Sequence, residues 1–335
     1  RGPGICLPGS REVVMTILVT GGAGFIGSHI CQGLLERGER VVSIDNFNNY
    51  YNPQYKRENI AEVAVGHEKH FSSLAGDLLD RTFLDQVFTS YAPESVIHLA
   101  ALAGVRPSIK DPIAYSEVNI NGTLNLLETM QQHKVPRLIF ASSSSVYGNN
   151  QVPFSEQDPV DRPISPYAAT KKAGELLCYT YHHLYQLSIA CLRFFTVYGP
   201  RQRPDLAIYK FMKLISEHER IPFYGDGSTQ RDYTFIDDLK NGVLSAVDWI
   251  RREPPSYEIF NLGGSSTISL SQLVATIEET LGIKAQLQRL PAQSGDVERT
   301  YADISKAQRL LGYNRQTPFS EGIKSFVAWF RERGR

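Results

Sequence analysis

The first 193 residues alternate short apolar runs with longer amphipathic segments. The runs have the length of buried strands, and the segments have the length and apolar spacing of helices. Strands that alternate with helices through short links are typical of an α/β fold, a doubly wound parallel sheet with right-handed crossovers. Strands are predicted at 16–20, 41–45, 71–77, 95–101, 138–142 and 187–193, and helices at 25–36, 83–91, 113–133 and 167–185.

The pattern loosens after residue 193. We expect a first domain over 15–193 and a smaller, discontinuous α/β substrate lobe over 194–335, some segments of which return to the first domain. Residues 1–14 contain three Gly and two Pro and precede the strand that follows Met15, so we expect a disordered leader or a misplaced start. Loops or turns are predicted at 198–205 and 221–227, extended segments at 231–236 and 257–261, and helices at 206–219, 237–250, 269–281, 305–311 and 319–331.

Composition excludes several classes of protein. The chain has 35 Lys and Arg against 35 Asp and Glu, which argues against an electrostatic binder of nucleic acid or membranes. No apolar run approaches the length of a membrane span. The four cysteines have neither metal-ligand spacing nor the density of a disulfide scaffold, so we expect buried free thiols in a reducing cytoplasm. No H-E-x-x-H pattern occurs, and no metal site is expected.

A glycine-rich turn separates the first predicted strand from the first predicted helix. It reads Gly21-Gly22-Ala23-Gly24-Phe25-Ile26-Gly27. In this context glycines allow a tight turn, the approach of a pyrophosphate and close packing of helix on sheet. The helix N-terminus offers free N–H groups to phosphate. A purely structural turn is the plainer interpretation, but strand, turn and helix together favour a dinucleotide site and a Rossmann-type sheet.

The second strand ends in Asp45. A carboxylate at this strand end accepts hydrogen bonds from the adenosine ribose and repels a 2′-phosphate. Asn46 follows, and no Arg or Lys comes directly after it, which favours NAD over NADP. The alternative is that Asp45 is simply a turn residue. Ala100, Ala101 and Ser142 end later strands, and ligands of such sheets lie beyond the carboxyl ends of the strands, so we expect these residues to face the cofactor. His98 lies inside a strand and is expected in the core.

Tyr167 and Lys171 lie four residues apart on one face of a predicted helix, whose first turn suits Pro166. An ammonium group beside a phenol favours the phenolate and lowers its pKa. The pair is therefore a candidate proton acceptor for a sugar hydroxyl. Taken alone, the spacing is common and also fits an exposed Tyr/Lys pair on an amphipathic helix.

Together these motifs resemble the extended short-chain dehydrogenase/reductase family of nucleotide-sugar enzymes. The resemblance rests on 21–27, Asp45, 76–78, 98–101, 119–123, 142–148, 167–171 and 231–233. It implies that Tyr167 is the acid/base, that Lys171 lowers the pKa of Tyr167 and binds the nicotinamide ribose, and that Ser143 and Ser145 are hydroxyls at the reacting sugar. The cofactor contacts that it implies are Gly21, Gly24, Phe25, Ile26, Gly27, Asp45, Asn46, Asp77, Leu78, Leu99, Ala100, Ala101, Asn119, Ser142, Tyr167 and Lys171.

The residues after the catalytic serine distinguish the reactions of this family. Its dehydratases carry Asp-Glu there and its decarboxylases usually a Glu, whereas this chain has Ser144 and Ser145. Neither serine is a strong general acid, so the resemblance favours a 4-epimerase. An NAD-binding regulator without activity stays an alternative from another class, although the intact Ser143, Tyr167 and Lys171 set argues against it.

The loop after residue 193 resembles that of the UDP-glucuronate 4-epimerases. Thr196 stands where UDP-glucose and UDP-N-acetylhexosamine epimerases usually have Asn, and Arg203 can bind a carboxylate with two hydrogen bonds. UDP-glucose or UDP-N-acetylglucosamine epimerase activity stays the nearest alternative, with UDP-glucuronate decarboxylase less favoured. The family also commonly forms homodimers, here through helices near 113–133 and 167–185. Further substrate contacts implied by the resemblance are Ser143, Ser144, Tyr224, Arg231 and Asp296, with Arg299 a weaker match.

Overall fold

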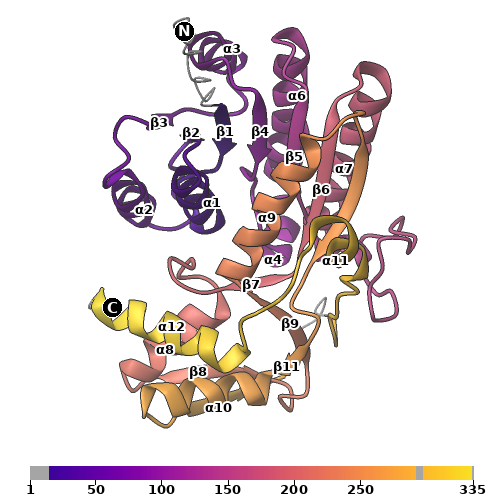
Figure 1. The fold of residues 1–335 in the computed structure, drawn as a ribbon. Coiled ribbons are helices and arrows are strands. Elements are labelled where there is room, and N and C mark those ends of the chain that lie inside the picture. Colours follow the sequence, from indigo (N-terminus) through magenta and orange to yellow (C-terminus); the bar gives the residue numbers. More distant parts are fainter. Residues whose placement is uncertain (1–14, 292–296, 334–335) are drawn as a thin grey trace, which may run out of the picture.

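The computed structural model describes residues 15–291 and 297–333, which form a larger and a smaller part (Figure 1). In this described portion, seven parallel strands make the central sheet, in the order β10-β6-β5-β4-β1-β2-β3. The order reverses beside β1, as in a Rossmann fold, so the predicted doubly wound sheet is confirmed. The strands are β1 (Thr16–Thr20), β2 (Arg40–Asp45), β3 (Phe71–Ala75), β4 (Ser95–His98), β5 (Arg137–Ser143), β6 (Ser188–Phe194) and β10 (Tyr257–Leu262).

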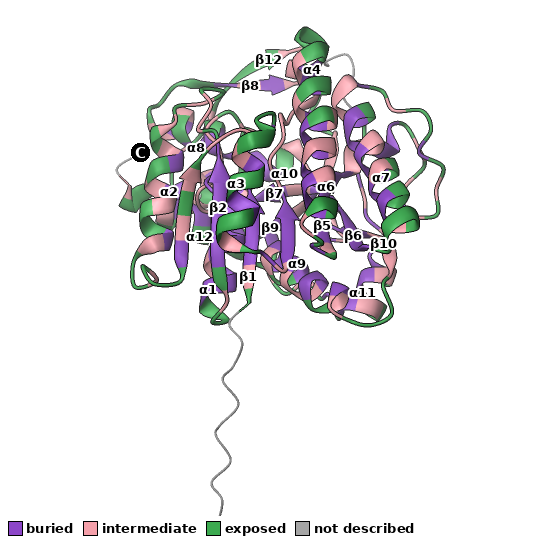
Figure 2. Ribbon diagram, turned by 90° about the horizontal axis from the view of Figure 1, so that it is seen from above, coloured by how far each residue is buried: buried purple, intermediate pink, exposed green. Residues whose placement is uncertain are grey.

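Helices cover both faces of this sheet, and its inner strands are almost wholly buried, whereas the edge strands β3 and β10 are partly exposed (Figure 2). Successive residues of a strand point to opposite faces. Ile17 and Val19 of β1 therefore join one hydrophobic cluster, whereas Leu18 joins the other. One face carries α1 (Phe25–Glu36), α2 (Gln54–Ala64), α9 (Ile236–Ile250) and α11 (Ser305–Leu311), and the other carries α3 (Arg81–Tyr91), α6 (Gly122–Gln132) and α7 (Pro166–Tyr185).

The long helix predicted at 113–133 is interrupted. Its first part is α5 (Pro112–Ser116), which follows the short helix α4 (Val105–Lys110), and a π-helical turn over Glu117–Asn121 joins it to α6. π-turns inside helices occur frequently at functional sites. Here the turn contains the buried Asn119, one of the predicted site residues.

The smaller part contains two small sheets. A mixed sheet has the order β11-β9-β7, and β8 pairs in parallel with β12. The turn predicted at 221–227 is confined to 225–227, because Arg220–Tyr224 forms β8. Pro222 suggested a break, but a two-stranded pair consists only of edges, where a missing N–H is tolerated. The elements are β7 (Thr196–Tyr198), β8 (Arg220–Tyr224), β9 (Gln230–Phe235), β11 (Thr267–Ser269), β12 (Gln286–Leu290), α8 (Ala207–Ser216), α10 (Leu270–Leu281) and α12 (Phe319–Glu332).

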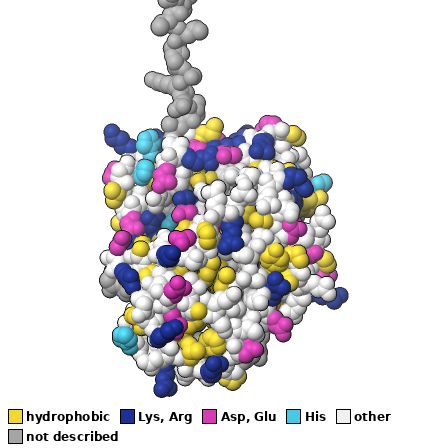
Figure 3. All heavy atoms as spheres, turned by 60° about the horizontal axis from the view of Figure 1, so that its bottom comes forward, with side chains coloured by type: hydrophobic (Ala, Val, Ile, Leu, Met, Phe, Trp, Pro, Cys, Tyr) yellow, Lys and Arg dark blue, Asp and Glu magenta, His cyan; other side chains and the backbone are white. Residues whose placement is uncertain are grey.

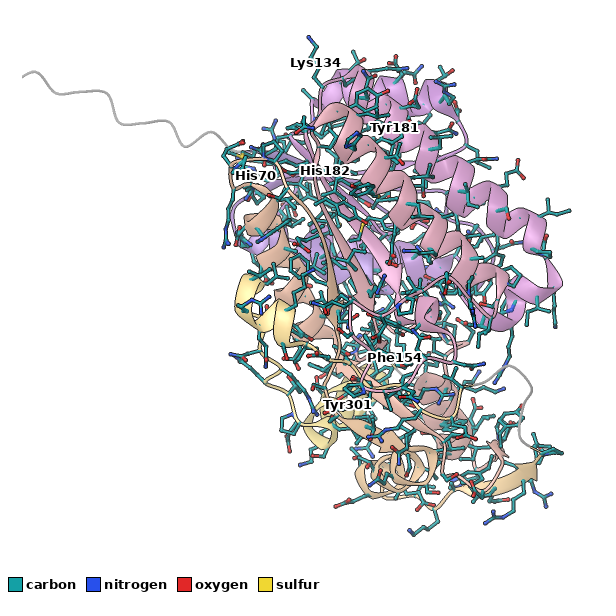
Figure 4. The ribbon with its side chains drawn as sticks, turned by 90° about the vertical axis from the view of Figure 1, so that its right-hand side faces the viewer. His70, Lys134, Phe154, Tyr181, His182 and Tyr301 are labelled. Atoms are coloured by element: carbon teal, nitrogen blue, oxygen red, sulfur yellow. The ribbon has the colours of Figure 1, made fainter. Side chains whose placement is uncertain are left out.

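Segments from the C-terminal half return to the larger part and connect the two. β10 completes the central sheet, and α9 packs on β5 and β6. At the junction, the Phe154 amide donates to the Tyr301 carbonyl at 2.7 Å, and both side chains are labelled there in Figure 4. The face shown in Figure 3 mixes basic, acidic and hydrophobic side chains. Within 15–291 and 297–333, no helix is both long and apolar enough to cross a membrane.

Candidate active site

A cavity of about 370 Å³ opens beyond the carboxyl ends of the central strands. This is where open α/β sheets bind their ligands. The predicted site residues among its lining are Gly21, Gly24, Phe25, Ile26, Gly27, Asp45, Asn46, Asp77, Leu78, Leu99, Ala100, Ala101, Ser142, Ser143, Tyr167, Lys171, Thr196 and Arg203. The fold thus brings most of the predicted cofactor residues to one cavity.

The glycine turn leaves no room for side chains against the sheet. A Cβ on Gly21 would come within 2.8 Å of the Ala100 nitrogen, and one on Gly27 within 2.2 Å of the Gly21 carbonyl oxygen. Gly21 also has φ +69°, which favours glycine. By contrast, the nearest atom to a Cβ on Gly24 would be 3.3 Å away, and no side chain caps α1 there. The open N-terminus of α1 therefore fits a phosphate group of a dinucleotide.

Asp45 is buried at the end of β2 and has a cationic partner that the sequence did not reveal. Its Oδ1 accepts from the Lys56 Nζ at 3.0 Å and from the Phe47 amide at 2.9 Å. Lys56 itself is buried and comes from α2. Sequence reasoning considered only the residues directly after Asp45 and did not anticipate this partner from α2. Asp45 suits ribose hydroxyls through hydrogen bonding, but Lys56 offsets the charge that would repel a 2′-phosphate.

The next edge of the cavity is formed by Asn46 and Asp77. The Asn46 Nδ2 donates to the Asp77 Oδ2 at 2.8 Å, which ties the end of β2 to the segment after β3. Asp77 also accepts from the Leu79 amide at 2.9 Å. These bonds hold both polar side chains beside Asp45, where an adenosine would lie if the glycine turn bound the pyrophosphate.

The helix α7 begins as predicted and delivers two of the catalytic candidates. Ser165 caps it by accepting from the Ala168 amide at 3.1 Å, and Pro166 occupies its first turn. Lys171 is buried, and its Nζ donates to the Ala141 carbonyl of β5 at 2.9 Å. Tyr167, one turn earlier, lines the same cavity as Ser143, and its ring meets the Tyr115 ring edge-on at 6.2 Å between centroids.

The electrostatics of this pair differ from the expectation. Burial raises the pKa of Tyr167 above its ordinary value, while the Ser143 hydrogen bond and the Arg203 charge lower it. Burial also lowers the pKa of Lys171 to about 8. Lys171 is bonded to a backbone carbonyl rather than to the phenol. In this structure, Ser143 and Arg203 are the groups that lower the pKa of Tyr167.

The serines after β5 have distinct partners. The Ser143 Oγ donates to the Ser145 Oγ at 3.1 Å and accepts from the Ser145 amide at 3.1 Å. Ser143 thus lies between Tyr167 and Ser145, in reach of both hydroxyls. Ser142 lines the cavity, but its own hydroxyl donates to the Glu175 carboxylate at 2.7 Å. Ser142 therefore does not have that proton available for a cofactor.

Asn119 supports the site from behind. Its Nδ2 donates to the Leu102 carbonyl and to the Thr170 Oγ1, both at 3.0 Å, and its Oδ1 accepts from the Leu102 amide at 2.8 Å. It does not line the cavity. Asn119 consequently fixes the segment after β4 against α7 rather than contacting a ligand in this arrangement.

A second cavity of about 150 Å³ adjoins the first at Thr196, which lines both. Ser144 and Ser145, which follow β5, line it from the larger part, and Arg231 of β9 lines it from the smaller part. Arg203 lines the first cavity, where its Nε and Nη2 donate to the Asp205 carboxylate at 3.0 and 2.8 Å. The two cavities together can hold a cofactor and a polar, anionic substrate side by side.

Other predicted residues lie apart from these cavities. Tyr224 ends β8, and the Arg106 guanidinium lies 5.8 Å from its ring centroid. Arg299 stacks on Tyr301 at 5.3 Å and lines neither cavity. Asp296 and the predicted leader fall outside the described residues. His98 lies in the core, where it bonds with two threonines.

Sequence reasoning missed several residues that shape the site. Tyr115 is one of the groups that act on the pKa of Tyr50, and the Arg203 guanidinium lies 5.0 Å from the Tyr50 ring centroid. Lys56 and Tyr51 line the same wall of the cavity. All but Tyr115 come from the segment after β2, where the sequence offers only a cluster of aromatic and basic residues. That cluster was the available signal.

The chain resembles known proteins along nearly its whole length. A family model described as GDP-mannose 4,6 dehydratase matches residues 18–326. The chain is 44% identical over 316 residues to UDP-glucuronate 4-epimerase of Thermodesulfobacterium geofontis, with 94% of this chain and 96% of that protein covered. It is also 44% identical over 332 residues to UDP-glucuronate 4-epimerase 4 of Arabidopsis thaliana, with 94% and 75% covered.

Solved structures show the same fold. UDP-glucuronic acid 4-epimerase from Bacillus cereus, in complex with UDP-glucuronic acid and NAD, is 37% identical, with a TM-score of 0.88 over 95% of this chain and 100% of that chain. UDP-glucose 4-epimerase of Thermotoga maritima, with UDP-glucose, is 31% identical, with a TM-score of 0.85 over 96% and 100%. Since the two act on different sugars by name, likeness of fold does not select the sugar.

Proposed function

Since the chain belongs to the extended short-chain dehydrogenase/reductase family of nucleotide-sugar epimerases, we propose that it interconverts UDP-glucuronate and UDP-galacturonate. The chain is an NAD-dependent UDP-sugar 4-epimerase. The observation that carries the choice of a uronic acid is the position of Thr196 between the two cavities, with Ser144 on one side and Arg203 on the other.

The glycine turn, the open N-terminus of α1 and the Asp45 carboxylate fit an adenine dinucleotide, and related Bacillus cereus structures contain NAD. When bound, NAD would supply the hydride acceptor for C4, and the same hydride would return to the opposite face of the rotated 4-keto sugar. The lining residues around Gly21–Gly27, Asp45, Asp77 and Ala100 would hold it. Because the reaction has no net redox change, the cofactor stays with the protein through turnover.

The proton is handled by the chain's own residues. Tyr167 takes the O4 proton, helped by the Ser143 hydrogen bond and the Arg203 charge, which favour its phenolate. Ser143 contacts O4 and relays the O4 proton to Tyr167, while Ser145, whose hydroxyl lies 3.1 Å from that of Ser143, orients the relaying hydroxyl. On return of the hydride, Tyr167 gives the proton back. Lys171 holds α7 to β5 and binds the nicotinamide ribose.

Arg203, Thr196 and Ser144 hold the sugar carboxylate. Arginine binds a carboxylate bidentately with charge assistance, and the guanidinium already makes such a pair with Asp205. The 4-keto intermediate of a glucuronate is a β-keto acid, which loses CO₂ when the carboxylate leaves the carbonyl plane. Holding the carboxylate still suppresses that loss. Arg231 would bind the UDP diphosphate, while Tyr224, Asp296 and Arg299 remain weaker substrate candidates.

We further propose a homodimer formed by α7 and the helices from α5 to α6. Large hydrophobic side chains are exposed on these helices: Ile113 is 78% exposed, Leu176 57% and Leu184 60%. Large apolar side chains that are exposed together on neighbouring helices are more typical of an interface than of a surface that stays in contact with water. A four-helix contact between two copies would cover it.

Purified protein assayed with UDP-glucuronate, UDP-glucose and UDP-N-acetylglucosamine tests the proposal. We expect kcat/KM for UDP-glucuronate to exceed kcat/KM for the two neutral sugars by at least about tenfold, because the residues that bind the carboxylate stabilise only a sugar that carries one. Preference for a neutral sugar would favour the nearest alternative. Carbon dioxide or a UDP-pentose as the main product would instead establish a decarboxylase, and no turnover of any UDP-sugar a regulator.

A further inference from the structure

Behind the catalytic serines lies a buried ion pair that the proposed mechanism does not use. Glu175 follows Lys171 by one turn of α7, and Arg193 comes from β6. Each side chain is 1% exposed. The Arg193 Nε and Nη2 donate to the two carboxylate oxygens of Glu175 at 2.8 and 2.9 Å. A buried ion pair loses about as much hydration as it gains in attraction, so stability alone does not account for it.

One end of this pair holds the residue before the catalytic serine. The Ser142 Oγ donates at 2.7 Å to the Glu175 Oε1, the oxygen that also accepts from the Arg193 Nε. Ser142 and Arg193 are also paired in register across β5 and β6. Neighbouring residues of a strand point to opposite sides. Tethering Ser142 to α7 therefore sets the direction in which Ser143 leaves the strand.

The other end of the pair holds the residue that closes the serine turn. The Arg193 guanidinium lies 4.8 Å from the centroid of the Tyr147 ring. Tyr147 is the last residue of the 3₁₀ turn Ser144–Tyr147 and is 1% exposed. Its hydroxyl donates to the Asn261 Oδ1 at 2.7 Å. The same guanidinium thus contacts both the carboxylate that holds Ser142 and the ring that ends the turn.

The groups around Glu175 keep it ionised. Although burial alone would raise the pKa of Glu175, the bonds from Arg193 and Ser142 and the charge of Lys172 hold it below its ordinary value. The Lys172 Nζ lies 3.2 Å from the second oxygen, and the Tyr257 hydroxyl donates to the Glu175 backbone carbonyl at 3.1 Å. Glu175 consequently joins α7, which carries Tyr167, to β5, which carries Ser143. It does so as a charged carboxylate whose two oxygens both have partners.

We propose that Glu175 and Arg193 are positioning residues for proton transfer, which clamp the serine turn at Ser142 and Tyr147 and so hold the Ser143 hydroxyl against Tyr167. Neither residue contacts the sugar. The pair acts through the placement of Ser143, on which proton transfer depends steeply, because small displacements of a reacting hydroxyl cost large factors in rate. This inference rests on the 4-epimerase chemistry and not on the choice of sugar.

The first test replaces both charges at once, as Glu175→Met with Arg193→Met. Removing one partner would leave an uncompensated buried charge, whereas removing both is tolerated far better. The protein is assayed with bound NAD, on whichever UDP-sugar the unsubstituted enzyme turns over. We expect a folded protein with KM within about twofold of the original and kcat lower by about tenfold or more, since binding is retained and geometry is lost.

The pH profile separates positioning from a merely structural role. Because the Ser143 hydrogen bond lowers the pKa of Tyr167, loosening it raises that pKa. The rise of kcat with pH should therefore move to higher pH in the double variant. A folded double variant with unchanged kcat and an unchanged pH profile would overturn the proposal.

A milder variant decides the matter if the double variant does not fold. Ser142→Ala removes only the hydroxyl that bonds to Glu175. Its matched control is Ser95→Ala, a buried serine at the other end of neighbouring β4, whose hydroxyl has no hydrogen-bond partner among the described residues. With equal bound NAD in both, we expect kcat to fall about threefold to tenfold in Ser142→Ala alone. Equal kcat in the two variants would refute the role of Ser142 and, with it, the clamp.

Discussion

At the scale of single residues, the site divides between moving a proton and holding an anion. In the proposed mechanism Ser143 and Tyr167 perform the first task, and Arg203 serves both, since its charge also lowers the pKa of Tyr167. Lys171, which the family resemblance credits with lowering the pKa of Tyr167, also anchors α7 to β5 through the Ala141 carbonyl.

Arg203→Ala should impair the enzyme selectively for a uronic acid. Loss of a charge-assisted bidentate contact costs roughly 1.5–3 kcal/mol, so kcat/KM for UDP-glucuronate should fall about 10-fold to 100-fold. Release of CO₂ per turnover should rise, because the carboxylate is less restrained. The exposed Arg252→Ala serves as control. If Arg203→Ala left kcat/KM for UDP-glucuronate unchanged, the carboxylate would have to be bound elsewhere.

Residues within a local motif could be predicted, and residues brought together only by the fold could not. Gly21, Asp45 and Tyr167 stand at strand ends or helix starts that the sequence marks. Lys56 of α2 contacts Asp45 at the end of β2, and Glu175 of α7 contacts Arg193 of β6. No spacing in the sequence reveals either contact.

At the scale of elements, the close contact between α1 and the turn before it leaves no room for a side chain at Gly27. Gly27→Ala would place a Cβ 2.2 Å from the Gly21 carbonyl oxygen and 2.7 Å from the Gly22 Cα, both rigid backbone. Overpacking of this kind costs about 1–3 kcal/mol, and α1 must move away from the turn. We therefore expect purified Gly27→Ala to carry little NAD, measured by release on denaturation. Gly33→Ala in the same helix meets only side chains and should retain its NAD.

The buried histidine of β4 makes stability depend on pH. Burial lowers the pKa of His98 to about 3, from an ordinary value of 6.5. Below pH 6.5 the unfolded chain therefore binds a proton that the folded protein does not, and stability falls as the pH falls. For this group alone, the loss between pH 7 and pH 5 is about 2 kcal/mol.

Urea unfolding at pH 7 and pH 5 measures this effect. His98→Asn should lose about 2 kcal/mol less than the unsubstituted protein over that interval. The exposed His218→Asn should behave like the unsubstituted protein. An identical pH dependence in His98→Asn would mean that His98 does not govern acid sensitivity.

Helices and strands were predicted correctly where an apolar pattern continues over many residues. The prediction failed where contacts with other elements determine the local structure. The strands of the central sheet and the helices packed on it were predicted within a few residues, except α2 (Gln54–Ala64), which was not predicted. The π-turn over Glu117–Asn121 was not predicted either, since it keeps the apolar spacing of the helices on either side. The strand β8 was missed because Pro222 suggested a turn, although its pairing with β12 tolerates proline.

At the scale of the whole molecule, the proposed dimer can be tested by substitution on α7. A charge within an apolar interface is strongly disfavoured. We expect sedimentation equilibrium to give twice the 37.6 kDa chain mass, and Leu176→Glu to give the single-chain mass. Val65→Glu, at an apolar residue beyond α2 that is more exposed than Leu176, should stay dimeric. A single-chain mass for the unsubstituted protein would contradict the dimer.

The central claim is that two lobes enclose a UDP-uronate whose C4 is inverted without loss of its hydride. UDP-glucuronate labelled with deuterium at C4, incubated with the protein in ordinary water, tests this most directly by mass spectrometry of the product. The account predicts UDP-galacturonate that retains the deuterium, with at least about 100-fold slower formation by Tyr167→Phe. A UDP-pentose, or UDP-galacturonate without the deuterium, would contradict it.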